Sequence, residues 1–238
     1  MNRYLNIFAL IIIAIPFLCS GCDKAKDVTG VTIIPDICVL KVGETRELTA
    51  IVSPDDADDQ SVRWAVNALR PIDSSKGQDV ATIIPETGKV NGVSEGFARI
   101  VCITNNMFCE ARALVMVGYS TAVKGVYEGS LSKNGKVVNN PFHIGIETLS
   151  EYEALFGLPT PISNGESCPV TVSRNSDTTM YFEGENTINL QGVMTLVQVN
   201  GYVSLDGIGD FEITLNSDPV TKYTFFGTII IGDKSRPF

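Results

Sequence analysis

The sequence predicts an all-β protein with two successive antiparallel domains. Apolar and polar residues alternate through short stretches, for example 96–100 and 223–231, and Gly, Pro, Asp or Asn residues separate these stretches. Alternation with a period of two is typical of strands that bury one face. Glycine and β-branched residues are plentiful, whereas long helical patterns of Ala, Leu, Glu and Lys are missing. A chain of 238 residues is long enough for one large domain or two small ones.

The N-terminus has the organisation of an export signal. Arg3 supplies a positive charge, and residues 7–18 form an apolar segment of 12 residues, short of the roughly 20 that span a bilayer. Two small residues then precede Cys22 directly. This arrangement resembles a bacterial lipobox, although Cys19 stands where Leu is usual. The resemblance implies that residues 1–21 are a signal peptide and that Cys22 carries lipid; the alternative is an ordinary secretory signal followed by an incidental cysteine.

Residues 22–27 are predicted to form a short charged tether between the lipid and the first domain. Acidic residues just after a lipidated cysteine resemble the surface-export signals of Bacteroidota lipoproteins. In sorting of the enterobacterial type, Asp23 would instead favour retention in the inner membrane. We expect a cell-envelope lipoprotein of the outer membrane that faces either the cell surface or the periplasm.

The charge of the chain excludes some classes of partner. There are 18 Lys and Arg against 27 Asp and Glu, a net charge of −9, and loss of Arg3 with the signal peptide makes it −10. Nucleic acids and anionic lipid surfaces are bound through basic patches, so neither is an expected partner. After Cys22 no apolar run reaches the length of a membrane-spanning helix, so none is predicted there.

Residues 28–118 carry an ordered series of short motifs. Strand-like stretches are interrupted by a Gly-Glu-Thr motif at 43–45, a Ser-Pro-Asp-Asp-Ala turn at 53–57 and a Thr-Gly-Lys turn at 87–89. This order resembles the bacterial Ig-like domain, group 2, of intimin- and invasin-type adhesins and of many surface lipoproteins. The resemblance implies an Ig-like β-sandwich. Trp64 lies in the middle of a predicted strand, where its large ring suits the core between the two sheets.

Two stretches of this domain invite a functional interpretation. Residues 65–79 are longer than the usual connection of the family, and we favour an insertion without a role over a contact loop. An acidic cluster offers oxygen ligands of the kind that calcium prefers; its members are Asp55, Asp56, Asp58 and Asp59. A full twelve-residue ligand loop is lacking, so we interpret the cluster as a solvated turn and expect no metal site.

The cysteines beyond the predicted lipidation site are Cys38, Cys102, Cys109 and Cys168. An exported setting permits disulfides, while the lack of CxxC spacing and the single histidine argue against zinc. Two asparagines at 105–106 suit a two-residue hairpin turn, which would place Cys102 opposite Cys109 with Cα atoms about 5.5 Å apart. A bridge between them is geometrically open. Cys38 is the rival partner, and the connectivity among all four stays open, with burial as free thiols as the alternative.

Residues 119–123 are predicted to be a linker, and residues 124–238 a second antiparallel β domain. An Asn-Gly pair at 134–135 is a strong hairpin signal, whereas residues 149–158 have a pattern that suits one or two helical turns. The further strand candidates are 142–148, 170–174, 178–183, 187–198, 201–205, 210–216 and 223–231. About eight strands in meander order can remove their exposed edges by closing into a barrel; a second open sandwich is the alternative.

Three sequence features of this second domain resemble known patterns. Its opening Val-Tyr-Glu-Gly-Ser-Leu, its hairpin and its closing Tyr-Thr-Phe-Phe-Gly-Thr are similar to the calycin-like domains of Bacteroidota lipoproteins. This resemblance implies the meander barrel. Asp177-Thr178-Thr179 also resembles a short acceptor pattern for O-glycosylation in Bacteroidota.

No motif in the sequence singles out catalytic chemistry. A GxSxG nucleophile motif and a Gly-rich phosphate loop are both absent, and His143 lies in a strand-like run that suits a structural role. Glycosidases need only two carboxylates, but no motif selects such a pair. We therefore expect no enzyme activity and no cofactor.

The domain order predicts a binding or adhesion protein, with the Ig-like domain as spacer and the C-terminal domain as contact module. The expected partners are the membrane, through the lipid, and a glycan or a host or cell-surface protein. The alternative is a lipid-tethered carrier of a small apolar ligand, of the calycin type, and a glycan-active enzyme is less favoured. The aromatic contact candidates are Tyr152, Phe156, Tyr181, Tyr202 and Tyr223, although most aromatic residues of β domains belong to the core.

Overall fold

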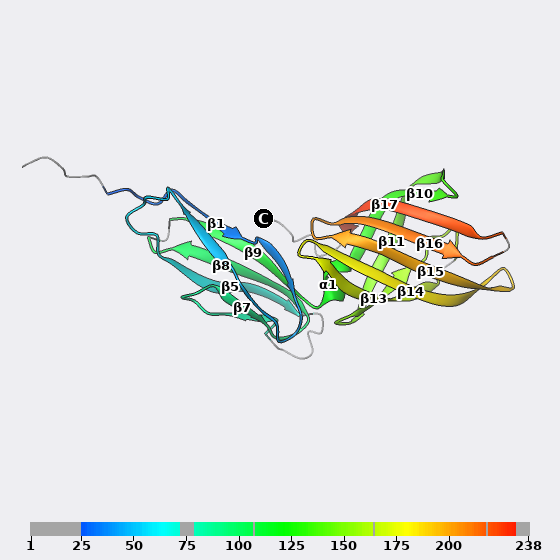
Figure 1. Cartoon of the computed structure of the whole chain (residues 1–238), viewed down its shortest axis with the longest axis horizontal. Helices are drawn as coiled ribbons and strands as arrows, with labels where there is room; N and C mark the ends of the chain where they lie inside the picture. The colour runs from blue at the N-terminus through cyan, green and yellow to red at the C-terminus, as the bar shows by residue number, and fades with distance from the viewer. Residues whose placement is uncertain (1–24, 72–78, 107, 164, 218, 232–238) are drawn as a thin grey trace, which may run out of the picture.

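The computed structural model describes residues 25–71, 79–106, 108–163, 165–217 and 219–231. Within these residues the chain is almost entirely β, as the sequence predicts, with one short helix, α1 (Tyr119–Val123). Two β domains lie end to end, and α1 lies between them (Figure 1). The first described residues lie at the end of the N-terminal domain that points away from the second domain (Figure 1). The predicted signal peptide and Cys22 lie outside the described residues.

The N-terminal domain is a β-sandwich, which confirms the predicted Ig-like architecture. Its described strands are β1 (Gly30–Ile34), β2 (Ile37–Leu40), β3 (Thr45–Glu47), β4 (Thr49–Ser53), β5 (Val62–Pro71), β6 (Ala81–Ile83), β7 (Lys89–Gly92), β8 (Gly96–Thr104) and β9 (Glu110–Val117). One sheet has the order β2–β9–β8–β5 and another β3–β7–β6, while β1 pairs with β4. The pairing is antiparallel except between β2 and β9.

Period-two alternation builds the core of this sandwich. On β8, Ile100 and Cys102 are completely buried, as are Val115 and Val117 on β9. Trp64 of β5 is 4% exposed and packs in the same cluster. The core therefore consists of alternate residues from facing strands, filled by one large indole.

Strand β5 extends into the predicted long connection, 65–79. It continues through Pro71 in antiparallel register with β8, with a bulge between Val66 and Ala68. Residues 65–71 of the predicted connection are therefore part of the sheet, and the bulge accommodates one extra residue on β5. The remaining residues, 72–78, lie outside the described part of the chain.

The hairpin between β8 and β9 has a different register from the predicted one. Cys102 lies opposite Ala111, and the Thr104 amide donates to the Cys109 carbonyl over 3.0 Å. The Thr104 hydroxyl donates to the Asn106 side chain (2.6 Å) and accepts from the Cys109 amide (3.2 Å), and these local bonds close a wider turn. The prediction that Cys102 faces Cys109 is therefore wrong, and both are free thiols, as are Cys38 and Cys168.

The C-terminal domain is a closed barrel of eight antiparallel strands in meander order, counted over the described residues. These strands are β10 (Gly125–Lys133), β11 (Lys136–Ser150), β12 (Glu153–Gly157), β13 (Ser167–Ser176), β14 (Thr179–Leu190), β15 (Val193–Ser204), β16 (Ile208–Leu215) and β17 (Thr221–Ile231). Pairing of β10 with β17 closes the barrel. The meander barrel is confirmed, and the open-sandwich alternative is wrong.

The predicted helical turns at 149–158 are also wrong. Strand β12 occupies this stretch and pairs with β11 on one side and β13 on the other. Ala154 and Phe156 are completely buried and Glu153 is exposed, so the period is two. Neighbouring aromatic and apolar residues at 152 and 155–156 hide this period in the sequence.

Aromatic rings fill the middle of the barrel. The ring of Phe211 lies 5.2 Å from that of Tyr127, 5.4 Å from Phe156 and 5.3 Å from both Phe182 and Phe225 (centroid distances). An eight-stranded barrel has an interior just wide enough for side chains to fill. This interior is therefore a packed core made largely of aromatic rings.

Glycines on the same strands make room for these rings. A Cβ at Gly209 would lie 2.4 Å from the Phe211 ring, and one at Gly227 would lie 2.7 Å from the Phe225 ring. On each strand the glycine stands two residues from an inward aromatic ring and so faces the same interior. Inward positions that alternate between aromatic residues and glycine fit the taper of a small barrel.

The predicted linker 119–123 is a buried helix and not an exposed connection. All five residues of α1 are buried. The hydroxyl of Tyr127, from the barrel, donates to the Val123 carbonyl over 2.7 Å. Val39 and Met116 of the sandwich belong to the same apolar cluster as α1 and the barrel interior. The two domains therefore share one continuous apolar contact.

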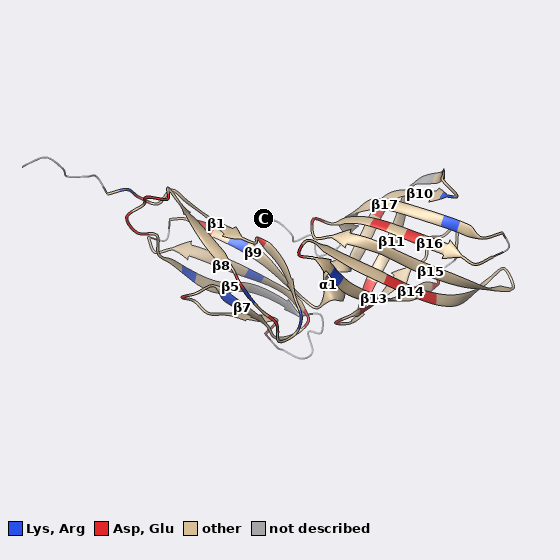
Figure 2. Cartoon of the chain, in the orientation of Figure 1, with Lys and Arg blue, Asp and Glu red and all other residues tan. Residues whose placement is uncertain are grey.

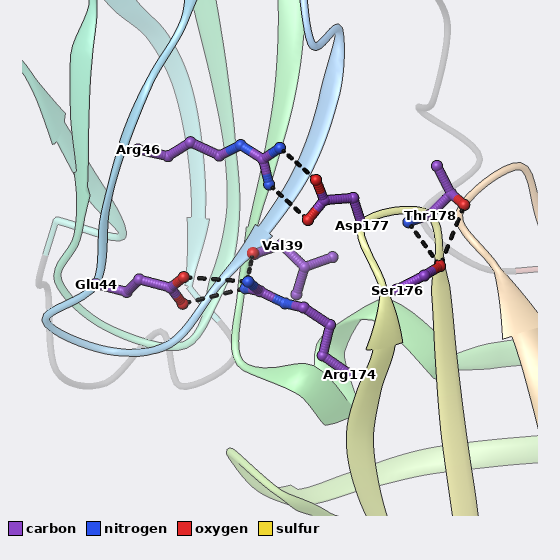
Figure 3. A network of polar contacts seen from close by, with 7 residues as sticks. All are labelled: Val39, Glu44, Arg46, Arg174, Ser176, Asp177 and Thr178. Carbon is purple, nitrogen blue, oxygen red and sulfur yellow. Dashed lines mark hydrogen bonds and ion pairs between the residues drawn. The ribbon is translucent and has the colours of Figure 1, made fainter.

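Polar contacts also connect the two domains at this junction (Figure 3). Arg174 of β13 binds both carboxylate oxygens of Glu44 at 3.1 Å and also donates to the Val39 carbonyl. Arg46 of β3 binds both carboxylate oxygens of Asp177 at 3.3 and 3.0 Å. These two-pronged pairs run in opposite directions across the junction, so both domains supply a cation and an anion.

Candidate binding face on the barrel

Strands β14 to β17 lie side by side and present their outward residues on one face of the barrel (Figure 1). Along β14, Met180 and Phe182 are completely buried, so Tyr181 and Glu183 face outward. The same alternation holds on β15 to β17, where Val203, Phe211 and Phe225 point inward. The strand registers then arrange the outward residues in rows that cross the strands.

One of these rows is aromatic. Tyr181 pairs with Tyr202, Tyr202 with Asp210, and Asp210 with Phe226. We call the row of Tyr181, Tyr202, Asp210 and Phe226 the aromatic row, after its three rings; it crosses four strands, which at ~4.8 Å spacing is about 14 Å. Tyr202 is 46% exposed and Phe226 is 60% exposed. The rings of Tyr181 and Tyr202 lie 5.1 Å apart at an angle of 48°, so they form a tilted pair on the surface.

Two polar rows follow the aromatic row along the strands. Their members are Glu183, Asn200, Glu212 and Thr224 in the first, and Glu185, Gln198, Thr214 and Lys222 in the second. The Tyr181 hydroxyl donates to Glu183 over 2.8 Å, and the Gln198 amide donates to Glu185 over 3.5 Å. Lys222 pairs with Glu212 over 2.6 Å. The polar rows thus combine carboxylates with amide and hydroxyl groups.

A depression of about 450 Å³ lies over the polar rows and is bordered by the aromatic row at Tyr181. Its lining residues are Tyr181, Glu183, Gly184, Glu185, Gln198, Val199, Asn200, Glu212 and Thr214. Gly184 permits a close approach of β14 to β13, because a Cβ there would lie 2.0 Å from the Pro169 carbonyl oxygen. A residue with a side chain at position 184 would therefore force β14 and β13 apart at this depression.

The face has an excess of negative charge. Within the three rows, the acidic residues Glu183, Glu185, Asp210 and Glu212 stand against one base, Lys222. Figure 2 shows acidic residues on β14 and β16 and a basic residue on β17. The hydrogen bond to the Glu183 carboxylate raises the pKa of Tyr181, because the neutral phenol is the form that donates. Tyr181 therefore stays uncharged at neutral pH.

The chemistry available on this face is stacking and hydrogen bonding. Among the described residues, no group of three or more His, Cys, Asp and Glu side chains is arranged to hold a metal ion. His143, the sole histidine of the sequence, lies on β11 and contacts Glu128 of β10 over 3.0 Å, and neither residue belongs to these rows. Flat rings beside oriented acceptors and donors can bind a ligand that has both an apolar surface and polar groups.

The structure separates the aromatic candidates that the sequence suggested. Phe156 and Tyr223 are core residues, 0% and 4% exposed. Tyr152 packs edge to face against Tyr119 at the domain junction, with centroids 5.7 Å apart. Tyr181 and Tyr202 alone of the five come together on the exposed face.

Phe226 is the member of the row that sequence reasoning missed. It follows Phe225 directly, and one of two adjacent residues in a strand must face outward. The inward positions Tyr223 and Phe225 have the same parity, so Phe226 takes the opposite one. The outward orientation of Phe226 could therefore be predicted from the alternation along β17. The residues that lie beside Phe226 on β15 and β16 could not be predicted, because they depend on strand registers that the sequence does not reveal.

Comparison with known proteins identifies the N-terminal domain. Residues 27–115 match the bacterial Ig-like domain (group 2). A lacto-N-biosidase of Bifidobacterium bifidum is 38% identical over 88 residues, which cover 35% of this chain and 7% of that protein. The chain therefore spans only a small part of this curated relative.

Solved structures offer two further similarities. The PKD domain of human KIAA0319 is 20% identical, covers 41% of this chain and 89% of its own, and has a TM-score of 0.28. A proposed outer-membrane protein of Bacteroides fragilis is 12% identical over 75% of this chain and 79% of its own, with a TM-score of 0.36. In the described part of the present chain, no helix combines the length and apolar character needed to cross a membrane.

Proposed function

We propose that this chain, whose residues 27–115 are a bacterial Ig-like domain of group 2, is an envelope lipoprotein that binds a surface ligand through its barrel. Ig-like domains of this kind are typical of adhesion and surface proteins. In the proposal, lipid on Cys22 anchors the chain to the outer membrane and the sandwich acts as a spacer. The first described residues lie at the end of the sandwich away from the barrel (Figure 1), so the barrel would be the part farthest from the anchor.

The observation that carries the proposal is the exposed aromatic row beside the depression. Tyr202 and Phe226 expose 46% and 60% of their surface, although Tyr223 and Phe225 of β17 are buried in the barrel core. Exposed aromatic side chains that gather on one face, bordered by polar groups, are typical of a contact surface. Single exposed apolar residues occur on any protein, but here three of the four residues in one row across β14 to β17 are aromatic.

Two other functions receive less support. A carrier of small apolar ligands needs room inside the barrel, and here the aromatic rings pack against one another in its middle. The curated relative is a glycosidase, but the match spans 7% of its length and does not show activity for this chain. Binding without catalysis is therefore the function that we propose.

The test is a binding panel with the mature chain, lacking only its lipid. Immobilised glycans and host-matrix proteins would be probed with the wild type, with Y202A/F226A, and with F108A. Phe108 is 87% exposed in the β8–β9 turn of the sandwich, so F108A controls for the loss of an exposed ring elsewhere. We expect at least one ligand that the wild type and F108A bind and Y202A/F226A does not. Equal binding by all three proteins would overturn the proposal.

A further inference from the structure

We infer that the depression and the aromatic row bind an uncharged glycan, with the sugar chain running across strands β14 to β17. This inference rests on the proposed function and names its ligand class. It follows from three properties of the face: the flat rings, the oriented carboxylates and amides, and the sign of the charge.

The rings match the apolar side of a sugar. A sugar ring has faces made of C–H groups and a rim of hydroxyl groups, so it can stack on an aromatic ring while its rim stays polar. Tyr202 is exposed and is held against Tyr181, and Tyr181 is in turn oriented by its hydrogen bond to Glu183. Little conformational freedom is lost when such a pre-oriented pair receives a ligand. Phe226, two strands from Tyr202, would contact a second part of the same chain.

The polar rows match the hydroxyl groups. Each sugar hydroxyl is one donor and also an acceptor, so it can bind a carboxylate and an amide together. Glu185 accepts from Gln198, and Glu212 pairs with Lys222. These partners set the orientation of each carboxylate, and an ionised carboxylate has about four acceptor positions, so further hydroxyl donors can be accepted. Asn200 lies between Glu183 and Glu212 and adds an amide to the same depression.

The charge selects among glycans. Four carboxylates and one ammonium group stand in the three rows, so a sugar that carries carboxylate or sulfate groups would meet like charge. A cationic peptide is the competing ligand class. Three of the four carboxylates already have a phenol, an amide or an ammonium partner, which favours neutral hydroxyl donors over a free cation.

The experiment compares defined probes on the mature chain. Affinity electrophoresis would use a set of neutral polysaccharides (glucans, mannans and galactans), polygalacturonate as the acidic probe, and poly-lysine as the cationic probe. We expect retardation by at least one neutral polysaccharide and none by polygalacturonate. Retardation should change little with added salt, because hydrogen bonding and stacking are not screened as charge pairs are.

Variants then locate the site. Y202A and Q198A should each weaken binding of that polysaccharide by about tenfold or more, F108A should leave it unchanged, and thermal unfolding should show that all three remain folded. Binding of poly-lysine but of no neutral polysaccharide, with loss of that binding in Y202A, would overturn the glycan inference and leave the proposed function standing. Neutral-glycan binding that Y202A and Q198A do not weaken would overturn the assignment of this face.

Discussion

At the scale of single residues, Trp64 is held in the sandwich by a backbone position that suits only glycine. Gly88 has φ of +72°, and a Cβ there would lie 2.8 Å from Cε2 of Trp64 and 2.6 Å from the Leu48 carbonyl oxygen. The turn amide of Gly88 also donates to the Ile84 carbonyl over 3.0 Å. The indole can therefore pack directly against the main chain, which explains why a large ring fits between two small sheets.

We expect G88A to destabilise the sandwich by about 2 kcal/mol or more, because the left-handed backbone and the close approach both penalise a Cβ. G43A is the matched control: Gly43 has φ of +82° with no atom within 4 Å of its Cβ position, so only the backbone cost of about 1 kcal/mol applies. Urea unfolding followed by fluorescence of Trp64, the sole tryptophan, would measure both. Equal losses in the two variants would contradict a role for the Trp64 contact.

The burial of the cysteines could be predicted from the sequence, whereas the partner that faces Cys102 could not. Burial raises the pKa of Cys38, Cys102 and Cys168 to about 11, so these thiols stay protonated and act as small apolar side chains. Their inward position follows from alternation with neighbouring core residues. The pairing of Cys102 with Cys109 failed because hydrogen bonds of the Thr104 hydroxyl decide the turn, and a side-chain bond of this kind has no signature in the alternation.

At the scale of the elements, the barrel depends on a match between rings and glycines. Phe211 lies at the centre of the aromatic contacts, within 5.2 to 5.4 Å of four other rings. Gly209 and Gly201 leave space beside these rings, because their Cβ positions would lie 2.4 Å from the Phe211 ring and 3.0 Å from the Phe182 ring. The Phe211 side chain thus connects β16 with four other strands, β10, β12, β14 and β17.

We expect F211A to destabilise the barrel by about 3–5 kcal/mol, the usual cost of removing a core aromatic ring and leaving a cavity. F226A, on the adjacent strand of the same hairpin and 60% exposed, should change stability by no more than about 0.5 kcal/mol. Thermal unfolding monitored by far-ultraviolet circular dichroism would compare them. A small effect of F211A would mean that the barrel interior can lose a ring at little cost, as a ligand-holding cavity would.

Most strands of the barrel could be predicted from the sequence, whereas the aromatic row on β14 to β17 could not. Alternation identified most barrel strands, and Asn134-Gly135, with φ of 47° and 79°, does form the predicted turn between β10 and β11. The aromatic row depends on how four strands align, and a shift of one residue would turn its side chains into the core. The sequence suggested Tyr181 and Tyr202 separately and could not show that Phe226 lies in line with them.

At the scale of the whole molecule, the junction connects the sandwich and the barrel through apolar and polar contacts. The apolar cluster of the barrel includes Val39 and Met116 of the sandwich, and the Val42 amide donates to Glu151 of the β11–β12 turn over 2.9 Å. The guanidinium of Arg174 also lies 5.2 Å from the centre of the Tyr119 ring. A rigid junction would hold the proposed binding face at a constant angle to the sandwich, which a flexible linker would not.

The ion pairs of this junction make its stability depend on pH. The hydrogen bond and charge of Arg46 lower the pKa of Asp177. Partial burial acts to raise the pKa of Glu44, but the Lys41 amide and Arg174 outweigh it, so the pKa is lowered. A carboxyl group whose pKa is lower in the folded chain contributes stability above its unfolded pKa, and this contribution is lost as the pH falls through the folded value.

We therefore expect the melting temperature of the wild type to exceed that of E44Q/D177N near pH 7, and the gap to close as the pH falls below about 4, where carboxyl groups ordinarily protonate. E110Q is the matched control, because it removes an ion pair with Arg112 within strand β9 that does not cross the junction. The melting temperature of E110Q should differ little from that of the wild type at each pH. Calorimetry of the three proteins across this range measures the difference. A wild-type gap over E44Q/D177N that stays constant with pH would show that these two carboxylates do not stabilise the junction through their charge.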